Sequence, residues 1–222
     1  MNSRRTFCRC ILCPLTRHLS PVTRHLLPAT CLLICLLTLS GCSLPKPQPD
    51  PTRFFVLSTA AVRATPVPNA PVVHLREVEL ASYLRTRPVI VRRGENEIEF
   101  REFALWGEPL EMGIARVLRE ELLARGAASG VVSSPGRREQ ANAELNLGVR
   151  VLACEGGANG EVVFRAVWEV ATTGAPATAI ARGDFRPADL RWDGKTEASL
   201  AAQLSQAVAG LAGEIAGAIG RK

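Results

Sequence analysis

Histidine is scarce in this sequence, and its scarcity limits the chemistry that the chain can perform. The 222 residues include three histidines, and His74 is the only one after residue 41. No Ser–His–Asp or Cys–His constellation is visible around it, and one histidine does not make a histidine-based metal site. The sequence therefore favours a noncatalytic protein that needs no cofactor and no metal.

An excess of positive charge is also missing once the N-terminus is set aside. The whole chain has 27 Lys and Arg against 21 Asp and Glu, but the first 41 residues hold five arginines and no acidic residue. The rest of the chain has 27 − 5 = 22 basic against 21 acidic side chains. Nucleic-acid binding needs a clear positive surface, so we do not expect it.

The longest uncharged apolar run is too short to cross a bilayer. It covers the 14 residues 26–39 and follows Arg24, whereas a membrane-spanning helix needs about 20 apolar residues. A basic flank, a short apolar core and small residues are typical of a secretory signal. We therefore interpret residues 1–41 as a signal peptide.

The residues Leu39-Ser40-Gly41-Cys42 that follow resemble the lipobox of bacterial lipoproteins. The resemblance implies cleavage before Cys42 and acylation of that cysteine by chains such as palmitate, which hold a protein on a bilayer. Ser43, rather than Asp, follows the cysteine, and in two-membrane bacteria this implies sorting to the outer membrane, facing the periplasm, in preference to the inner membrane. Residues 42–53 form the next segment, in which prolines at 45, 47, 49 and 51 predict a semi-rigid tether of roughly 25–30 Å.

Cysteine is nearly absent from the remaining chain. Five of the seven cysteines precede Cys42, which leaves Cys154 as the single thiol of residues 54–222. A disulfide within that part is therefore excluded, and its stability must come from the packing of an apolar core.

The order of apolar patterns predicts an α+β fold. Short or alternating apolar runs predict strands, and apolar residues three and four apart predict helices. The predicted strands cover residues 54–58, 72–80, 89–92, 98–103, around 131, 145–153, 162–170 and 178–185, and the predicted helices cover about 110–122 and 197–219. We expect one domain, residues 54–222, with two long helices on a mostly antiparallel sheet.

Glycines in two places carry further expectations. The segment from Glu155 to Gly160 reads EGGANG between two strands, which predicts a hairpin loop and argues against a phosphate-binding loop, because the latter leads into a helix. Cys154 just before it is predicted to share the face of Arg150 and to be an ordinary, unreactive thiol. Gly210, Gly213 and Gly217 lie in the last helix and predict close packing there, against the sheet or a partner subunit.

Two motifs give a more specific resemblance. The stretch from Val78 to Leu123 resembles the ABC-type transport auxiliary lipoproteins, in which an aromatic strand, here FFVLS from Phe54, precedes an L-P-x-Y-L-D-R-P-x-I-V pattern and then an R-W-x-E-P-L helix start. The chain departs from the pattern with Ala81 for proline, with Arg85-Thr86 for a single Asp, and with Leu105 for Arg. The matching positions are Tyr83, Leu84, Arg87, Pro88, Ile90 and Val91, and then Trp106, Glu108, Pro109 and Leu110.

The resemblance implies a noncatalytic role beside MCE-type (MlaD-like) substrate-binding proteins and an ABC ATPase, which move lipids or other apolar molecules between two membranes. The domain would dock the MCE component or form an oligomeric exit collar. The residues proposed for partner contact are Tyr83, Leu84, Arg85, Arg87, Pro88 and Trp106. The helix-start residues, Trp106 among them, also have a purely structural interpretation, because proline and acidic residues suit a first helical turn. A lipid carrier with its own cavity and a structural envelope lipoprotein remain the alternative functions.

Overall fold

A computed structural model describes residues 48–59, 69–132 and 144–221. The chain divides into two units, Met1–Asp50 and Pro51–Lys222, and the helices and strands described here belong to the second unit. Cys42 and the apolar run before it lie outside the described residues. Within the described part, no helix combines the length and the apolar character that crossing a membrane requires.

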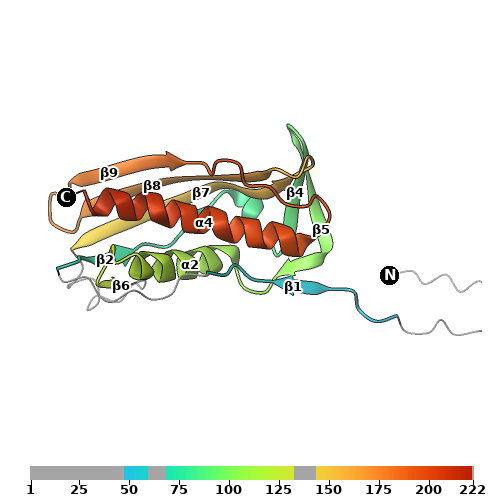
Figure 1. Cartoon of the computed structure of the whole chain (residues 1–222), viewed down its shortest axis with the longest axis horizontal. Helices are drawn as coiled ribbons and strands as arrows, with labels where there is room; N and C mark the ends of the chain where they lie inside the picture. The colour runs from blue at the N-terminus through green and yellow to red at the C-terminus, as the bar shows by residue number, and fades with distance from the viewer. Residues whose placement is uncertain (1–47, 60–68, 133–143, 222) are drawn as a thin grey trace, which may run out of the picture. The chain divides into compact units, whose positions relative to one another are not determined.

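The described residues of the second unit form nine strands, one short 3₁₀ helix and two long α-helices (Figure 1). Their bounds are β1 Arg53–Phe55, β2 Val72–Leu75, β3 Glu79–Leu80, η1 Ser82–Leu84, β4 Pro88–Gly94, β5 Glu97–Trp106, α2 Leu110–Ala124, β6 Gly130–Val132, β7 Leu145–Gly157, β8 Val162–Thr172, β9 Ala179–Phe185 and α4 Glu197–Ile219.

The strands form one mixed sheet, and the α+β expectation is confirmed. Its order runs β1-β5-β4-β7-β2-β6, while β8 and β9 extend from β7, and β3 also pairs with β7. The long ladders β4–β5, β7–β8 and β8–β9 are antiparallel, whereas the short pairings, such as β1 with β5 and β2 with β7, are parallel. Helix α4 packs across β7, β8 and β9, and α2 packs beside α4.

The hairpin of β7 and β8 forms because each strand has one apolar side. Leu145, Leu147, Val149 and Val151 face the core with the matching side chains of β8, and all four are buried. The observed loop is shorter than the predicted EGGANG loop, because β7 continues to Gly157. The turn closes around Gly160, whose φ is 76°. Strands flank the turn on both sides, as the hairpin prediction requires.

The prediction that Cys154 shares the face of Arg150 is wrong, and a β-bulge is the reason. The register between β7 and β8 shifts between Val151 and Ala153. One extra residue reverses the alternation of side chains that follow it. Cys154 is therefore buried in the core, on the opposite face from Arg150, and Glu155 after it is buried too.

Two other strand expectations need correction. The single strand predicted for residues 72–80 is two strands, β2 and β3, separated by a stretch in which Arg76 and Glu77 are both exposed. The FFVLS run is not a fully buried strand either. Strand β1 buries Phe55 on its core side, while Phe54 on its other side and Val56 after the strand remain exposed.

The final helix follows its sequence pattern. Helix α4 buries the predicted stripe of leucine, valine and isoleucine, and Thr196 caps its start by accepting a bond from the Ser199 amide. A Cβ on Gly210 would lie 3.0 Å from the Phe185 ring, and one on Gly213 would lie 3.3 Å from Arg125. Close packing is thus confirmed at these two glycines, whereas Gly217 faces open space.

Candidate functional site

A short loop between β3 and β4 carries most of the residues proposed for partner contact. The core fixes its first half. Leu84 is buried, the Tyr83 hydroxyl donates a hydrogen bond to the Leu152 carbonyl at 3.2 Å, and the Ala81 amide donates to the Val151 carbonyl at 2.9 Å. Arg85 and Arg87 then project outward and are exposed. The loop therefore presents two guanidinium groups from a rigid support.

The second motif, Trp106 to Leu110, begins α2 next to this loop. The buried Trp106 donates its amide to the Arg87 carbonyl at 2.7 Å, and the Gly107 amide donates to the Phe55 carbonyl at 2.8 Å. Pro109 then starts the helix, and its carbonyl accepts bonds from the next turn. These bonds tie the helix start to the loop and to β1.

The two motifs together form one groove of about 360 Å³. Glu108 on its wall pairs with Arg116 at 2.5 Å, and Arg116 also donates to the Leu57 carbonyl at 2.8 Å. Segments twenty residues apart in the sequence thus meet at one surface. The groove is lined by Arg85, Thr86 and Arg87 from the loop and by Gly107, Glu108, Pro109, Leu110 and Glu111 from the helix start.

The structure separates the six proposed contact residues into three pairs according to their exposure. Arg85 and Arg87 are exposed beside the groove, and Tyr83 and Pro88 are half-buried. Leu84 and Trp106 are core residues, so they hold the loop and the helix start in place and do not present a surface. Cys42, the proposed lipidation site, lies outside the described residues.

An ion pair between a half-buried arginine and a buried glutamate lies beneath the loop, and the sequence analysis did not predict it. Glu155 is fully buried in β7, and Arg92 from β4 donates its Nε to Glu155 Oε1 at 2.6 Å. Burial first, and then the Glu155 carboxylate, raise the pKa of Tyr83 well above its usual range. The sequence placed Glu155 in a glycine-rich turn, and its partner is 63 residues away.

The sequence of this domain matches a known protein family. The family model described as "ABC-type transport auxiliary lipoprotein component" matches residues 55–216.

This chain belongs to that family.

Solved structures support the family's fold. One, described as the crystal structure of an uncharacterized protein, is 17% identical and covers 74% of this chain and 96% of its own, with a TM-score of 0.59. Another, protein XCC0632 from Xanthomonas campestris of family DUF330, is 16% identical and covers 73% of this chain and 92% of its own, with a TM-score of 0.58. No curated protein matches the chain significantly.

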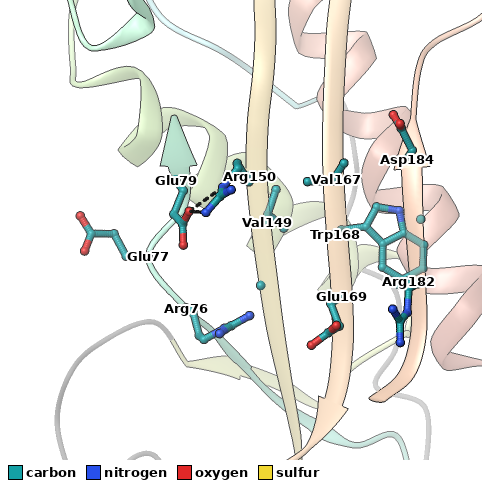
Figure 2. Close-up of a pocket in the computed structure, with 12 residues that line it drawn as sticks. Arg76, Glu77, Glu79, Val149, Arg150, Val167, Trp168, Glu169, Arg182 and Asp184 are labelled. Atoms are coloured by element: carbon teal, nitrogen blue, oxygen red, sulfur yellow. Dashed lines mark hydrogen bonds and ion pairs between the residues drawn. The ribbon is translucent and has the colours of Figure 1, made fainter. Parts of the chain in front are cut away.

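This auxiliary lipoprotein has a second, larger hollow on the face of β7, β8 and β9 that points away from α4, which we call the outer sheet face. Its volume is about 740 Å³, and the side chains around it carry both signs of charge. Figure 2 shows Arg150 paired with Glu79, at 2.5 Å between Nη2 and Oε2. Arg165 nearby makes a bidentate pair with Asp184. Ion pairs therefore neutralise Arg150, Glu79 and Asp184, whereas the other charged side chains around the hollow form no ion pair within the described residues. These are Arg76, Glu77, Glu169 and Arg182.

The other candidate reactive groups of this family member are held in structural roles. Burial, and then the charge of Glu155, raise the pKa of the Cys154 thiol far above its usual range, which keeps the sulfur protonated. His74 in β2 shares a hydrogen bond of 3.1 Å with Asn146. Within residues 48–59, 69–132 and 144–221, no group of three His, Cys, Asp or Glu side chains is placed to hold a metal ion. The family's auxiliary role in transport agrees with this arrangement.

Proposed function

We propose that this chain is the outer-membrane-anchored, noncatalytic auxiliary component of an MCE/ABC transport system that moves lipids or other apolar molecules between two membranes. Family membership supports the auxiliary role. The acylated Cys42 fixes the protein to the membrane, the proline-rich tether gives it reach, and the domain faces the periplasm.

The groove of loop 85–87 and the start of α2 is the surface that docks the MCE component, alone or within an oligomeric collar. The observation that carries this proposal is the pair of exposed arginines, Arg85 and Arg87, held by buried residues on the groove's edge. Neither arginine takes part in an ion pair with a carboxylate of the described residues. The partner is therefore expected to present acidic side chains, because complementary charge steers association and fixes its geometry.

The alternative of a free-standing lipid carrier has less support. The hollows described above and a third beside His74 are lined largely by charged and polar groups. Acyl chains need an apolar cavity, because burying unpaired polar groups against hydrocarbon is costly. The arrangement suits docking better than carriage.

The test is capture of the full-length, acylated protein from its own membranes after mild crosslinking, followed by mass spectrometry. We expect an MCE protein or ABC subunits to be retained. A Cys42→Ala variant should lose membrane attachment. Recovery of the protein alone, under conditions that preserve other envelope complexes, would contradict the docking role and favour a carrier or structural lipoprotein.

A further inference from the structure

A cluster of exposed apolar side chains adjoins the groove, and the transport role does not account for it. We call it the aromatic patch and define it as Phe54, Val56, Phe103 and Leu105. Phe54 is 60% exposed, Val56 55% and Phe103 48%. Phe54 and the half-buried Leu105 are register partners in β1 and β5, so their side chains lie on one face. Phe103 lies two residues before Leu105, where the pairing of β5 with β4 shifts register, and its ring is exposed.

The patch is unusual because apolar residues occupy the outward positions of β1 and of the residues that follow it. The inward positions are taken by Phe55 and Leu57, which point into the core and are buried. Outward positions of a strand in contact with water are normally polar, because one solvated face gives alternating apolar and polar residues. Here the outward positions are Phe54 and Val56, on a strand that ends the sheet order. Adjacent exposed apolar residues of this kind mark an interaction surface.

Arg87 borders the patch. Its guanidinium lies 5.7 Å from the centroid of the Phe54 ring, whereas Arg53 lies 5.4 Å from the ring of the buried Phe55, on the other side of β1. Neither forms an ion pair with a carboxylate of the described residues. On the acidic side, Glu102 is exposed beside Phe103, and Glu108 is already held by Arg116. Aromatic rings beside free guanidinium groups suit the interface of an anionic bilayer.

The chain length between the patch and the proposed anchor decides which occupant to name. Arg53 follows Cys42 by 53 − 42 = 11 residues, a segment that contains four prolines. At about 3.1 Å per residue, even a fully extended polyproline segment spans only about 34 Å. An acylated Cys42 would therefore keep β1 within reach of the lipid headgroups, and the local concentration of lipid surface at the patch would be high.

We propose that the aromatic patch docks on the phospholipid surface of the membrane that holds the anchor, with its apolar side chains among the headgroups and Arg87 at a lipid phosphate. The inference rests on the proposed acylation of Cys42. The patch orients the domain, because the acyl chains already supply attachment. It places the neighbouring groove at the level of the membrane surface, where a docked transport partner delivers or collects an apolar molecule.

The test uses full-length acylated protein in vesicles of phosphatidylethanolamine and phosphatidylglycerol that contain a photoactivatable phospholipid. No transport partner is present, so the result does not depend on the docking role. After illumination, peptides are mapped by mass spectrometry. We expect lipid adducts around residues 53–56 and 103–105, their loss in the variant Phe54→Ser/Val56→Ser/Phe103→Ser, and no adducts around Arg182 on the outer sheet face.

A second variant keeps the test decisive if the triple variant folds poorly. Phe54→Trp should be quenched by brominated phospholipid, whereas Arg182→Trp on the outer sheet face should not. Adducts confined to the acylated N-terminal peptide, or equal quenching of both tryptophans, would overturn the proposal. Protection of the patch by crosslinked copies of the chain, without lipid adducts, would overturn it in favour of self-association. An acylated protein that captures an MCE partner but shows no patch labelling would leave the transport role standing without this inference.

Discussion

The groove and the outer sheet face carry their arginines in different ways. Beside the groove, Arg85 and Arg87 are exposed next to apolar side chains, and neither has a carboxylate partner among the described residues. On the outer sheet face, Arg150 pairs with Glu79 and Arg165 pairs with Asp184. Arg182 on the outer sheet face is also the register partner of Glu169, so the contrast lies in the carboxylates that accompany the arginines.

This contrast suggests which surface is built for a partner. Exposed ion pairs in water contribute about 0–1 kcal/mol each, so the outer sheet face is adequately explained as a solvated, charge-balanced surface. Guanidinium groups without carboxylates, on a loop held rigidly by Leu84 and Tyr83, keep their charge available for an incoming acidic surface. The rigid support also lowers the entropy lost on binding.

The largest expected change in the free energy of unfolding is at Trp106 in β5, and Phe103 on the same strand is the comparison. Trp106→Ala should lower the free energy of unfolding by about 4 kcal/mol, because it removes a buried indole from the core beside the helix start. Phe103→Ala on the same strand is the control and should cost well under 1.5 kcal/mol, since that ring is half exposed. Urea denaturation followed by circular dichroism measures both. Similar losses for the two variants would show that Trp106 is not a core support of the groove.

The next largest loss of stability is expected at the ion pair of Arg92 and Glu155 beneath the loop. Arg92→Leu leaves the Glu155 carboxylate buried without its partner and should cost on the order of 3 kcal/mol. Adding Glu155→Gln removes the stranded charge, so the double variant should recover part of the loss. Chemical denaturation of the single and double variants gives the coupling. Strictly additive costs would contradict the pairing.

Alkaline pH should expose the buried titratable groups of the same region. The pKa of Cys154 is raised in the folded state by burial, so its contribution is complete below the unfolded pKa of about 8.5 and is lost as pH rises above that value. The free energy of unfolding should fall between about pH 8.5 and 10, by at most about 1.4 kcal/mol per pH unit from this thiol. Cys154→Ala should flatten that slope. A slope unchanged by the substitution would place its cause elsewhere, with Tyr83 the next group to test.

The smallest effect is expected on the outer sheet face. Arg150→Leu removes an exposed pair with Glu79 and should change the free energy of unfolding by no more than about 1 kcal/mol. Its thermal unfolding should be measured at low and high salt, because screening weakens surface pairs. A loss comparable to that of Arg92→Leu would remove the distinction between the two ion pairs.

The sequence predicted the elements well because their periods are regular. The apolar stripe of residues 200–219 matches a helix with a single buried side, and the alternation in residues 145–151 matches a strand with a single buried face. The two motifs around Arg87 and Trp106 were found from the sequence, and the structure brings them to one groove.

What the sequence did not predict depends on contacts between distant segments. The bulge that buries Cys154 and Glu155 arises in the pairing of β7 with β8, and the alternation of one strand alone cannot locate it. The exposure of Phe54 was missed for a similar reason. An apolar run of four residues looks like a buried strand, but whether both of its sides are covered depends on segments distant in the sequence, and here the side of Phe54 stays open.

The most direct test of the docking groove is a charge reversal on each of the two compared surfaces. The variant Arg85→Glu/Arg87→Glu and its control Arg76→Glu/Arg182→Glu each replace two exposed arginines, the first beside the groove and the second around the hollow of the outer sheet face. Both are expressed as full-length acylated protein, and MCE and ABC subunits captured after crosslinking are quantified against wild type. We predict that the groove variant loses most of the captured partner while the control retains it. Equal capture by the groove variant and wild type, or loss only in the control, would contradict docking at the groove.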